Sequence, residues 1–310
     1  MSPLRHAVDE YLALRQALGF RLCRPAALLT QFAAFLEQEG APYITRELAL
    51  RWAQQPIHAQ PAHWATRLGI VRRFAQFWRA SDPRTEVPPL GLLPHRYRRT
   101  HPYIYTDREI QRLLTVARQL PSATGIRPAT YATLLGLLAV TGLRISEALA
   151  LNQEDVGGPE ALLTIRRTKF GKSRLVPLHP SSRRALERYA RLRDRIYPRP
   201  HTDSFFVSER GNRLTQCTVR WTFNRLSRQI GLRGPADRCG PRLHDFRHRL
   251  AVRTLMRWYR AGVDVERHLP ELSTYLGHTH VNDTYWYVSA VPALLRLAAA
   301  RLEQRGGQLS

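Results

Sequence analysis

The chain has 310 residues and a formal net charge of +24, from 48 basic and 24 acidic residues. A hydrophobic content of 44% is ordinary for a chain with a buried core and excludes wholesale disorder. The longest apolar stretch is far too short to span a bilayer, and the first residues, MSPLRHAVDEY, lack the apolar run of a signal peptide.

The positive charge indicates a polyanionic partner. It is spread along the chain, with 14 arginines against 7 acidic residues in 1–100 and 34 basic against 17 acidic residues in 101–310. A membrane surface would favour one basic amphipathic helix or a clustered tail, so nucleic acid is the better interpretation. Three distant cysteines, Cys23, Cys217 and Cys239, indicate a reducing interior without disulfides or a zinc site.

Residues 3–80 have the apolar spacing of about four helices, punctuated by Gly19, Gly40 and Pro42. Basic side chains gather on the last of these helices, where they could line a DNA groove; they are Arg67, Arg72, Arg73 and Arg79. The alternative is an ordinary solvated helix face. Residues 1–81 are therefore predicted to be a small helical DNA-binding domain.

Residues 82–104 read as a linker, because five prolines forbid regular structure there. The linker also carries a basic run that includes Arg98 and Arg99. Such a segment between two basic domains can follow a phosphate backbone, so both arginines are candidate DNA contacts.

Residues 105–310 are predicted to form a second domain, mostly helical with one small antiparallel sheet. Thr106 begins a helix over 107–119 with a capping box, and an apolar helix over 131–150 is broken at Gly142. Two β-like runs, 162–166 and 174–178, form a hairpin. Further helical patterns lie at 181–197, 215–230, 244–261, 268–276 and 292–304. The last of these could dock on a neighbouring protomer or pack on its own domain.

Arg144 follows the glycine break at the end of the apolar helix, in the segment TGLRISE. A charge at the end of a core helix needs a partner, and Glu147 lies three residues on. The pair is either a structural salt bridge or part of an anion site.

His244 and Arg247 share one face at the start of a predicted helix, where backbone N–H groups also favour an anion. His278 follows a Leu-Gly helix end and could donate to a phosphate oxygen. With His280 it could also suggest a metal pair, but no third ligand has the right spacing, so no metal is expected.

Tyr287 is a candidate nucleophile, because a tyrosine hydroxyl beside cations can attack phosphorus. Tyr285, two residues earlier, is the rival. A lone tyrosine is far more often a core or surface residue.

In this order and spacing, the segments resemble the tyrosine recombinase (phage integrase) family over essentially the whole chain. TGLRISEAL resembles the first-arginine box, LHDFRH the second, and LGH followed nine residues later by a tyrosine the third. The resemblance implies a mainly α fold, with an N-terminal helical core-binding bundle and an α+β catalytic domain with a small antiparallel sheet.

The resemblance also implies roles for individual residues. Arg144 and Arg247 would bind the scissile phosphate, with His244 and His278 assisting binding and proton transfer. Glu147 would brace the site, and Lys169 would protonate the 5′-oxygen leaving group. Tyr287 would form a 3′-phosphotyrosyl link, its spacing from His278 selecting it over Tyr285.

The implied activity is site-specific DNA strand exchange that needs neither cofactor, metal nor ATP. The partners would be double-stranded DNA with inverted-repeat sites and further protomers, as a homotetramer on paired sites or with sister recombinases. A cytoplasmic, nucleoid-associated location and no membrane partner are expected. The alternatives are a type IB topoisomerase-like nicking and closing enzyme, or a non-catalytic DNA-binding protein on this fold.

The two lysines support one of these roles. The chain has 46 arginines but only Lys169 and Lys172, both in the predicted hairpin turn. A general acid must release its proton, which lysine can do beside other cations and arginine cannot. Lys172 could contact phosphate or act in place of Lys169; chance survival of both is the alternative.

Overall fold

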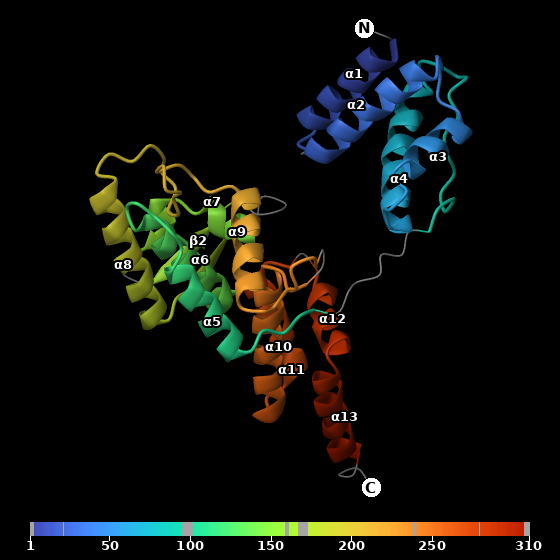
Figure 1. Cartoon of the computed structure of the whole chain (residues 1–310). Helices are drawn as coiled ribbons and strands as arrows, with labels where there is room; N and C mark the ends of the chain where they lie inside the picture. The colour runs from blue at the N-terminus through green and yellow to red at the C-terminus, as the bar shows by residue number, and fades with distance from the viewer. Residues whose placement is uncertain are drawn as a thin grey trace. The chain divides into compact units, whose positions relative to one another are not determined.

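A computed structural model describes residues 3–20, 22–94, 102–158, 161–166, 173–237, 240–278 and 280–306. Within these ranges the chain forms thirteen α-helices, a short 3-10 helix and three β-strands (Figure 1). They fall into two compact units, residues 1–100 and 101–310. The mainly helical fold with a small antiparallel sheet is confirmed.

The first unit is a four-helix bundle. Its helices are α1 (Pro3–Ala17), α2 (Cys23–Gln38), α3 (Arg46–Gln54) and α4 (Pro61–Trp78). Thr45 begins α3 by accepting a hydrogen bond from the Leu48 amide, and Pro61 occupies the first turn of α4, where its missing N–H costs nothing. The bundle closes over a buried aromatic core that includes Phe32, Trp52 and Phe74.

The second unit has nine of the described α-helices. They are α5 (Asp107–Arg118), α6 (Ile126–Thr141), α7 (Ile145–Ala150), α8 (Pro180–Ile196), α9 (Gln216–Gln229), α10 (Asp245–Arg260), α11 (Val265–Leu276), α12 (Asn282–Ala290) and α13 (Pro292–Gly306). The capping box expected at α5 is present, because Thr106 accepts from the Glu109 amide and Glu109 accepts from the Thr106 amide.

The sheet has the order β1-β2-β3 and is antiparallel throughout. The 3-10 helix η1 (Gln153–Asp155) leads into β1 (Val156–Gly157), and β2 (Leu162–Ile165) pairs with β3 (Arg174–Pro177) so that Ile165 lies opposite Arg174. The predicted hairpin is therefore present. Its turn, with Lys169 and Lys172, lies outside the described residues.

Helix α6 is the centre of the second unit and packs against α5, α8 and α10. It is apolar on most faces, as expected for a helix surrounded by others. Gly142 ends it with a positive φ of 62°, and a Cβ atom there would lie 2.7 Å from Leu250 Cδ2 on α10. Only glycine allows this conformation and this approach, which brings the end of α6 against α10.

The C-terminal helices differ from the sequence prediction in two places. Helix α11 begins at Val265, with Asp264 as its N-cap, and Pro270 lies inside it. Helix α12, which carries Tyr287, is absent from the sequence prediction. Helix α13 packs against α10 and α12 of its own unit.

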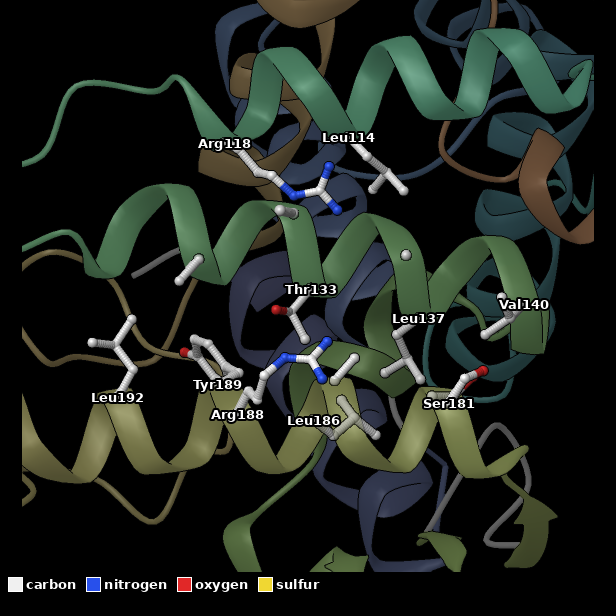
Figure 2. Close-up of a pocket in the computed structure, with 15 residues that line it drawn as sticks. Leu114, Arg118, Thr133, Leu137, Val140, Ser181, Leu186, Arg188, Tyr189 and Leu192 are labelled. Carbon is white, nitrogen blue, oxygen red and sulfur yellow. The ribbon is translucent and has the colours of Figure 1, made fainter.

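An apolar groove of about 400 Å³ lies between α5, α6 and α8 (Figure 2). Leu114, Leu137 and Leu186 contribute to its lining, and Arg118 and Arg188 extend into it from opposite walls. None of the predicted site residues lines this groove. No helix within the described ranges is long and apolar enough to cross a membrane.

Candidate active site

Arg144 lies at the N-cap of α7, directly after the turn at Gly142. Its amide donates to Glu147 Oε2 (2.9 Å), and its guanidinium Nη1 donates to Glu147 Oε1 (2.8 Å). Its Nη2 donates to the carbonyl oxygen of Gly277, 2.9 Å away. The first and third predicted motifs therefore meet at this side chain.

Arg247 extends from the first turn of α10 and is only 1% exposed. Its guanidinium donates to the carbonyl oxygens of Gly142 (3.1 Å) and Leu276 (2.5 Å), so it also joins the three motif segments. Burial, and then the charge of Arg144, lower the pKa of Arg247 to about 10, which still leaves it charged at neutral pH. Within the described part of the chain it forms no ion pair with a carboxylate.

The two predicted histidines flank these arginines. His278 follows the left-handed C-cap Gly277 of α11, and its Nδ1 lies 2.7 Å from Thr284 Oγ1. Burial, and then the positive charges of Arg247 and Arg144, lower the pKa of His278 to about 4. His244 is the N-cap of α10 and is exposed. Partial desolvation, and then the charge of Arg247, lower its pKa. The lowered pKa values favour the neutral imidazole in both residues at pH 7.

Tyr287 lies on α12 and is 2% exposed, whereas Tyr285 is 47% exposed. The Tyr287 ring stacks with that of His278 at 6.1 Å between centroids. Burial raises the pKa of the Tyr287 hydroxyl, while the charge of Arg247 and its hydrogen bond to Tyr287, and then the charge of Arg144, oppose that rise. The structure thus brings Tyr287, and not Tyr285, to the two arginines.

Glu147 is buried on α7 and is shared by two guanidinium groups. Arg174, at the start of β3, donates Nη2 to Glu147 Oε2 (2.8 Å) and Nη1 to Oε1 (3.1 Å). Burial alone would raise the pKa of Glu147, but Arg174 and then Arg144 outweigh it and bring the pKa to about 2. Sequence reasoning missed Arg174, whose only signal is its position at the start of the strand after the lysine turn.

His248 is a second residue that sequence reasoning missed, although it ends the segment LHDFRH. It is buried on α10, with its ring 5.4 Å from that of Tyr287 and 4.6 Å from that of His244. Desolvation and the nearby His244 lower its pKa to about 3. Its Nδ1 has no hydrogen-bond partner among the described residues. The His248 ring therefore packs against the Tyr287 ring as an uncharged neighbour.

The predicted lysines cannot be placed, because 167–172 lie outside the described residues. The two strands that flank this turn are described, and Arg174 on β3 contacts Glu147 directly. The base of the hairpin therefore lies beside the site, five residues from Lys169 along the chain.

The prediction that Arg67 faces DNA is wrong. Arg67 is 6% exposed, its guanidinium carbon lies 3.7 Å from the centroid of the Trp52 ring, and its Nη2 donates to the Trp52 carbonyl oxygen (2.9 Å). Burial lowers its pKa. Because a buried, stacked guanidinium cannot reach a phosphate, Arg67 belongs to the core of the first unit.

The other predicted DNA contacts are placed differently. Arg73 is exposed on α4. Arg72 is half-buried and donates to the Pro88 carbonyl oxygen at 2.5 Å. Arg98 and Arg99 lie outside the described residues. Arg79, the C-cap residue of α4, is also exposed, so Arg73 and Arg79 are the described side chains of this group that are open to a phosphate.

A basic recess of about 490 Å³ adjoins the site. Arg144 and His244 line it together with Arg220, Arg233 and Arg242. A concave surface with four arginines would attract a phosphate backbone. Among the described residues, no three His, Cys, Asp or Glu side chains cluster closely enough to hold a metal ion.

Residues 104–293 match the Phage integrase family. The chain is 53% identical to the integrase/recombinase y4rB of Sinorhizobium fredii, over 98% of each chain. It is 32% identical to tyrosine recombinase XerD of Caulobacter vibrioides, over 73% of this chain and 70% of that protein.

Two solved structures have a similar fold. One is the Tn1549 transposon integrase in complex with transposon right end DNA, with a TM-score of 0.67, 16% identity, and coverage of 96% of this chain and 98% of that one. The other is the XerH site-specific recombinase bound to palindromic difH substrate, with a TM-score of 0.65, 19% identity, and coverage of 90% and 78%.

Proposed function

The chain belongs to the phage integrase family of tyrosine recombinases, and from that membership we propose that it cleaves and rejoins DNA strands at specific sites through a 3′-phosphotyrosyl intermediate. The observation that carries this proposal is the convergence of two arginines from distant segments on one buried tyrosine. Guanidinium groups are cations that stabilise the charge that develops when phosphorus is attacked.

In the cleavage step, Arg144 and Arg247 bind the non-bridging oxygens of the scissile phosphate. The Tyr287 oxygen forms a bond to phosphorus as the bond from phosphorus to the 5′-oxygen breaks. Lys169 gives a proton to that 5′-oxygen, because an alkoxide is a poor leaving group. The tyrosine proton passes to a neutral imidazole, for which His278 and His244 are the candidates.

In the rejoining step, a 5′-hydroxyl attacks the phosphotyrosine, and the bond from phosphorus to the Tyr287 oxygen breaks. Lys169 takes its proton back from the attacking hydroxyl, and the imidazole returns its proton to the Tyr287 oxygen. The phosphotyrosyl bond conserves the energy of the original phosphodiester, so the reaction requires no ATP. Two arginines supply the charge neutralisation that a metal ion supplies in other phosphoryl-transfer sites, so no metal is needed.

The proposed partners are double-stranded DNA with inverted-repeat sites and further copies of the chain, forming a tetramer on paired sites or acting with sister recombinases. DNA as substrate would place the protein at the nucleoid, in the cytoplasm. The Tn1549 integrase and XerH structures, which have a similar fold and contain DNA, support a DNA partner.

The direct test is covalent capture on a suicide duplex, in which a nick beside the cleavage site lets the 5′-hydroxyl fragment diffuse away. With EDTA present and no ATP, we expect the polypeptide to become linked to the 3′ end of the cleaved strand. Denaturing gels report the link. Cleavage that required a divalent metal, or that left no linked protein, would contradict the mechanism.

DNA affinity should fall steeply with salt. If about ten phosphates are contacted, log K should decrease against log salt with a slope near −9. Arg73→Gln should make that slope shallower by about one, because it removes one phosphate contact. The neutral, exposed Gln76 on the same helix provides the control Gln76→Ala, which should leave the slope unchanged. Titrations at several salt concentrations measure it, and a flat response would remove DNA as the partner.

A further inference from the structure

Arg174, on β3, contacts two other segments of the site, although no predicted motif includes it. Its Nη1 and Nη2 bind both oxygens of Glu147, at 3.1 and 2.8 Å. Its Nε donates to the Tyr275 carbonyl oxygen, at 2.9 Å, near the end of α11. A Cβ atom at Gly277 would lie 2.7 Å from Arg174 Nη1. Arg174 thus fastens β3 to α7 and to the turn that precedes His278.

The same carboxylate holds Arg144. Arg144 Nη1 lies 2.8 Å from Glu147 Oε1, so one carboxylate bridges two guanidinium groups. The side chains of Arg174 and Glu147 are 11% and 5% exposed, and so solvent screens their charges weakly. Arg144 is more open, at 30%, which leaves its guanidinium accessible to a ligand.

The charges of these three residues decide how strongly Arg144 can attract a phosphate. A buried Arg144–Glu147 pair alone would be neutral overall, and the carboxylate would offset much of the pull of Arg144 on an anion. With Arg174 bound to the same carboxylate, the group has a net charge of +1. Planar, bidentate guanidinium geometry also fixes the carboxylate more tightly than an ammonium group could.

We propose that Arg174 is a positioning residue for DNA cleavage: by sharing Glu147, it orients Arg144 and keeps the carboxylate from cancelling the positive charge that binds the scissile phosphate. This inference rests on the proposed function. In this role Arg174 affects binding of the scissile phosphate and need not contact DNA itself.

The test measures single-turnover cleavage of a nicked suicide duplex at saturating protein. We expect Arg174→Gln to slow cleavage by about 10- to 100-fold, by analogy with the loss of residues that orient the ligands of a metal site. Arg174→Lys keeps the positive charge without the bidentate geometry, so its cleavage rate should lie between those of the wild type and Arg174→Gln. The matched control is Arg183→Gln, which removes a surface arginine paired with Glu187 on α8 and should keep the wild-type rate.

A second substitution separates this role from simple loss of a structural contact. In Arg174→Gln the negative charge of Glu147 is balanced by Arg144 alone. If this charge slows cleavage, adding Glu147→Gln to Arg174→Gln removes it, and the double variant should cleave faster than Arg174→Gln. The side-chain amide introduced at this position keeps an oxygen that can still accept from the Arg144 amide. If the combined variant is instead slower, by the product of the two single effects, the proposal is wrong.

A sulfur-containing substrate identifies the side of the reaction on which Arg174 acts. When sulfur replaces the bridging 5′-oxygen, the leaving thiolate needs no proton donor, so defects at the general acid disappear. Arg174→Gln should be slowed equally on the oxygen and sulfur substrates. Full rescue by sulfur would show that Arg174 acts through the lysine turn and would overturn the proposal.

Two further outcomes complete the test. If Arg174→Gln does not fold, Arg174→Lys takes its place, and a wild-type rate in that variant overturns the proposal. If the wild-type protein forms no covalent adduct, the proposed function fails. A wild-type adduct together with an undiminished rate in Arg174→Gln contradicts only the role of Arg174.

Discussion

Tyr287→Phe should abolish covalent capture of the protein on a nicked duplex and leave its affinity for that duplex unchanged. The substitution removes one oxygen atom, the one that would bond to phosphorus, and retains the ring that packs against His278 and His248. Because this hydroxyl is the proposed nucleophile, no residual rate through the same pathway is expected. Denaturing gels measure the adduct, and band-shift titration measures binding.

The matched control is Tyr285→Phe, two residues away on α12. Tyr285 is 47% exposed, so its hydroxyl should be dispensable for capture. An adduct that persists in Tyr287→Phe and disappears in Tyr285→Phe would reverse the assignment. Loss of capture in both variants, with binding intact, would point to a requirement for the helix itself.

Lys169→Arg should retain DNA binding and lose most cleavage, by about 10²–10³-fold if it removes a single catalytic donor. The change keeps the positive charge, so electrostatic attraction to the duplex is preserved. A guanidinium cannot release its proton at neutral pH, however, and so cannot protonate the 5′-oxygen. Single-turnover cleavage and equilibrium binding, measured on the same duplex, separate the two effects.

A bridging 5′-sulfur substrate again provides the discriminating control. It should restore cleavage to Lys169→Arg, because a thiolate leaves without a proton donor. Lys172→Arg should cleave the ordinary substrate at close to the wild-type rate. If Lys172→Arg is the variant that fails and sulfur restores it, the general acid is Lys172, three positions after Lys169 in the chain.

Much of the site could be predicted because its residues lie next to helix ends that the local sequence marks. Arg144 follows a glycine that ends a helix, and His244 and Arg247 begin one, so each motif sits at a helix terminus that the sequence marks by itself. The meeting of these termini is not local. It rests on hydrogen bonds from Arg247 to the carbonyls of Gly142 and Leu276, which no spacing rule contains.

The missed features depend on packing in three dimensions. Arg67 shares an apolar helical stripe with Val71 and Phe74, at i, i+4 and i+7, and closer attention to that spacing would have indicated burial. Helix α12 is short and rich in aromatic residues, so contacts with α10 and α11 stabilise it more than its own propensity does.

Arg174 could not be found from sequence for a related reason. Its partner Glu147 lies 27 positions away, and their contact depends on how the hairpin packs against α7. In a chain with 46 arginines, residue type alone could not single it out.

The residues of the site lie far apart in the chain, and this separation determines when the site can form during synthesis. Arg247 is joined to Gly142 across 105 positions, and Arg144 to Gly277 across 133. Domains generally fold as units as they emerge from the ribosome, the N-terminal one first. The helical bundle of the first unit is therefore expected to fold while the segment that carries Tyr287 is still unsynthesised. The site needs residues from Gly142 to Tyr287 and forms only when most of the chain has been made.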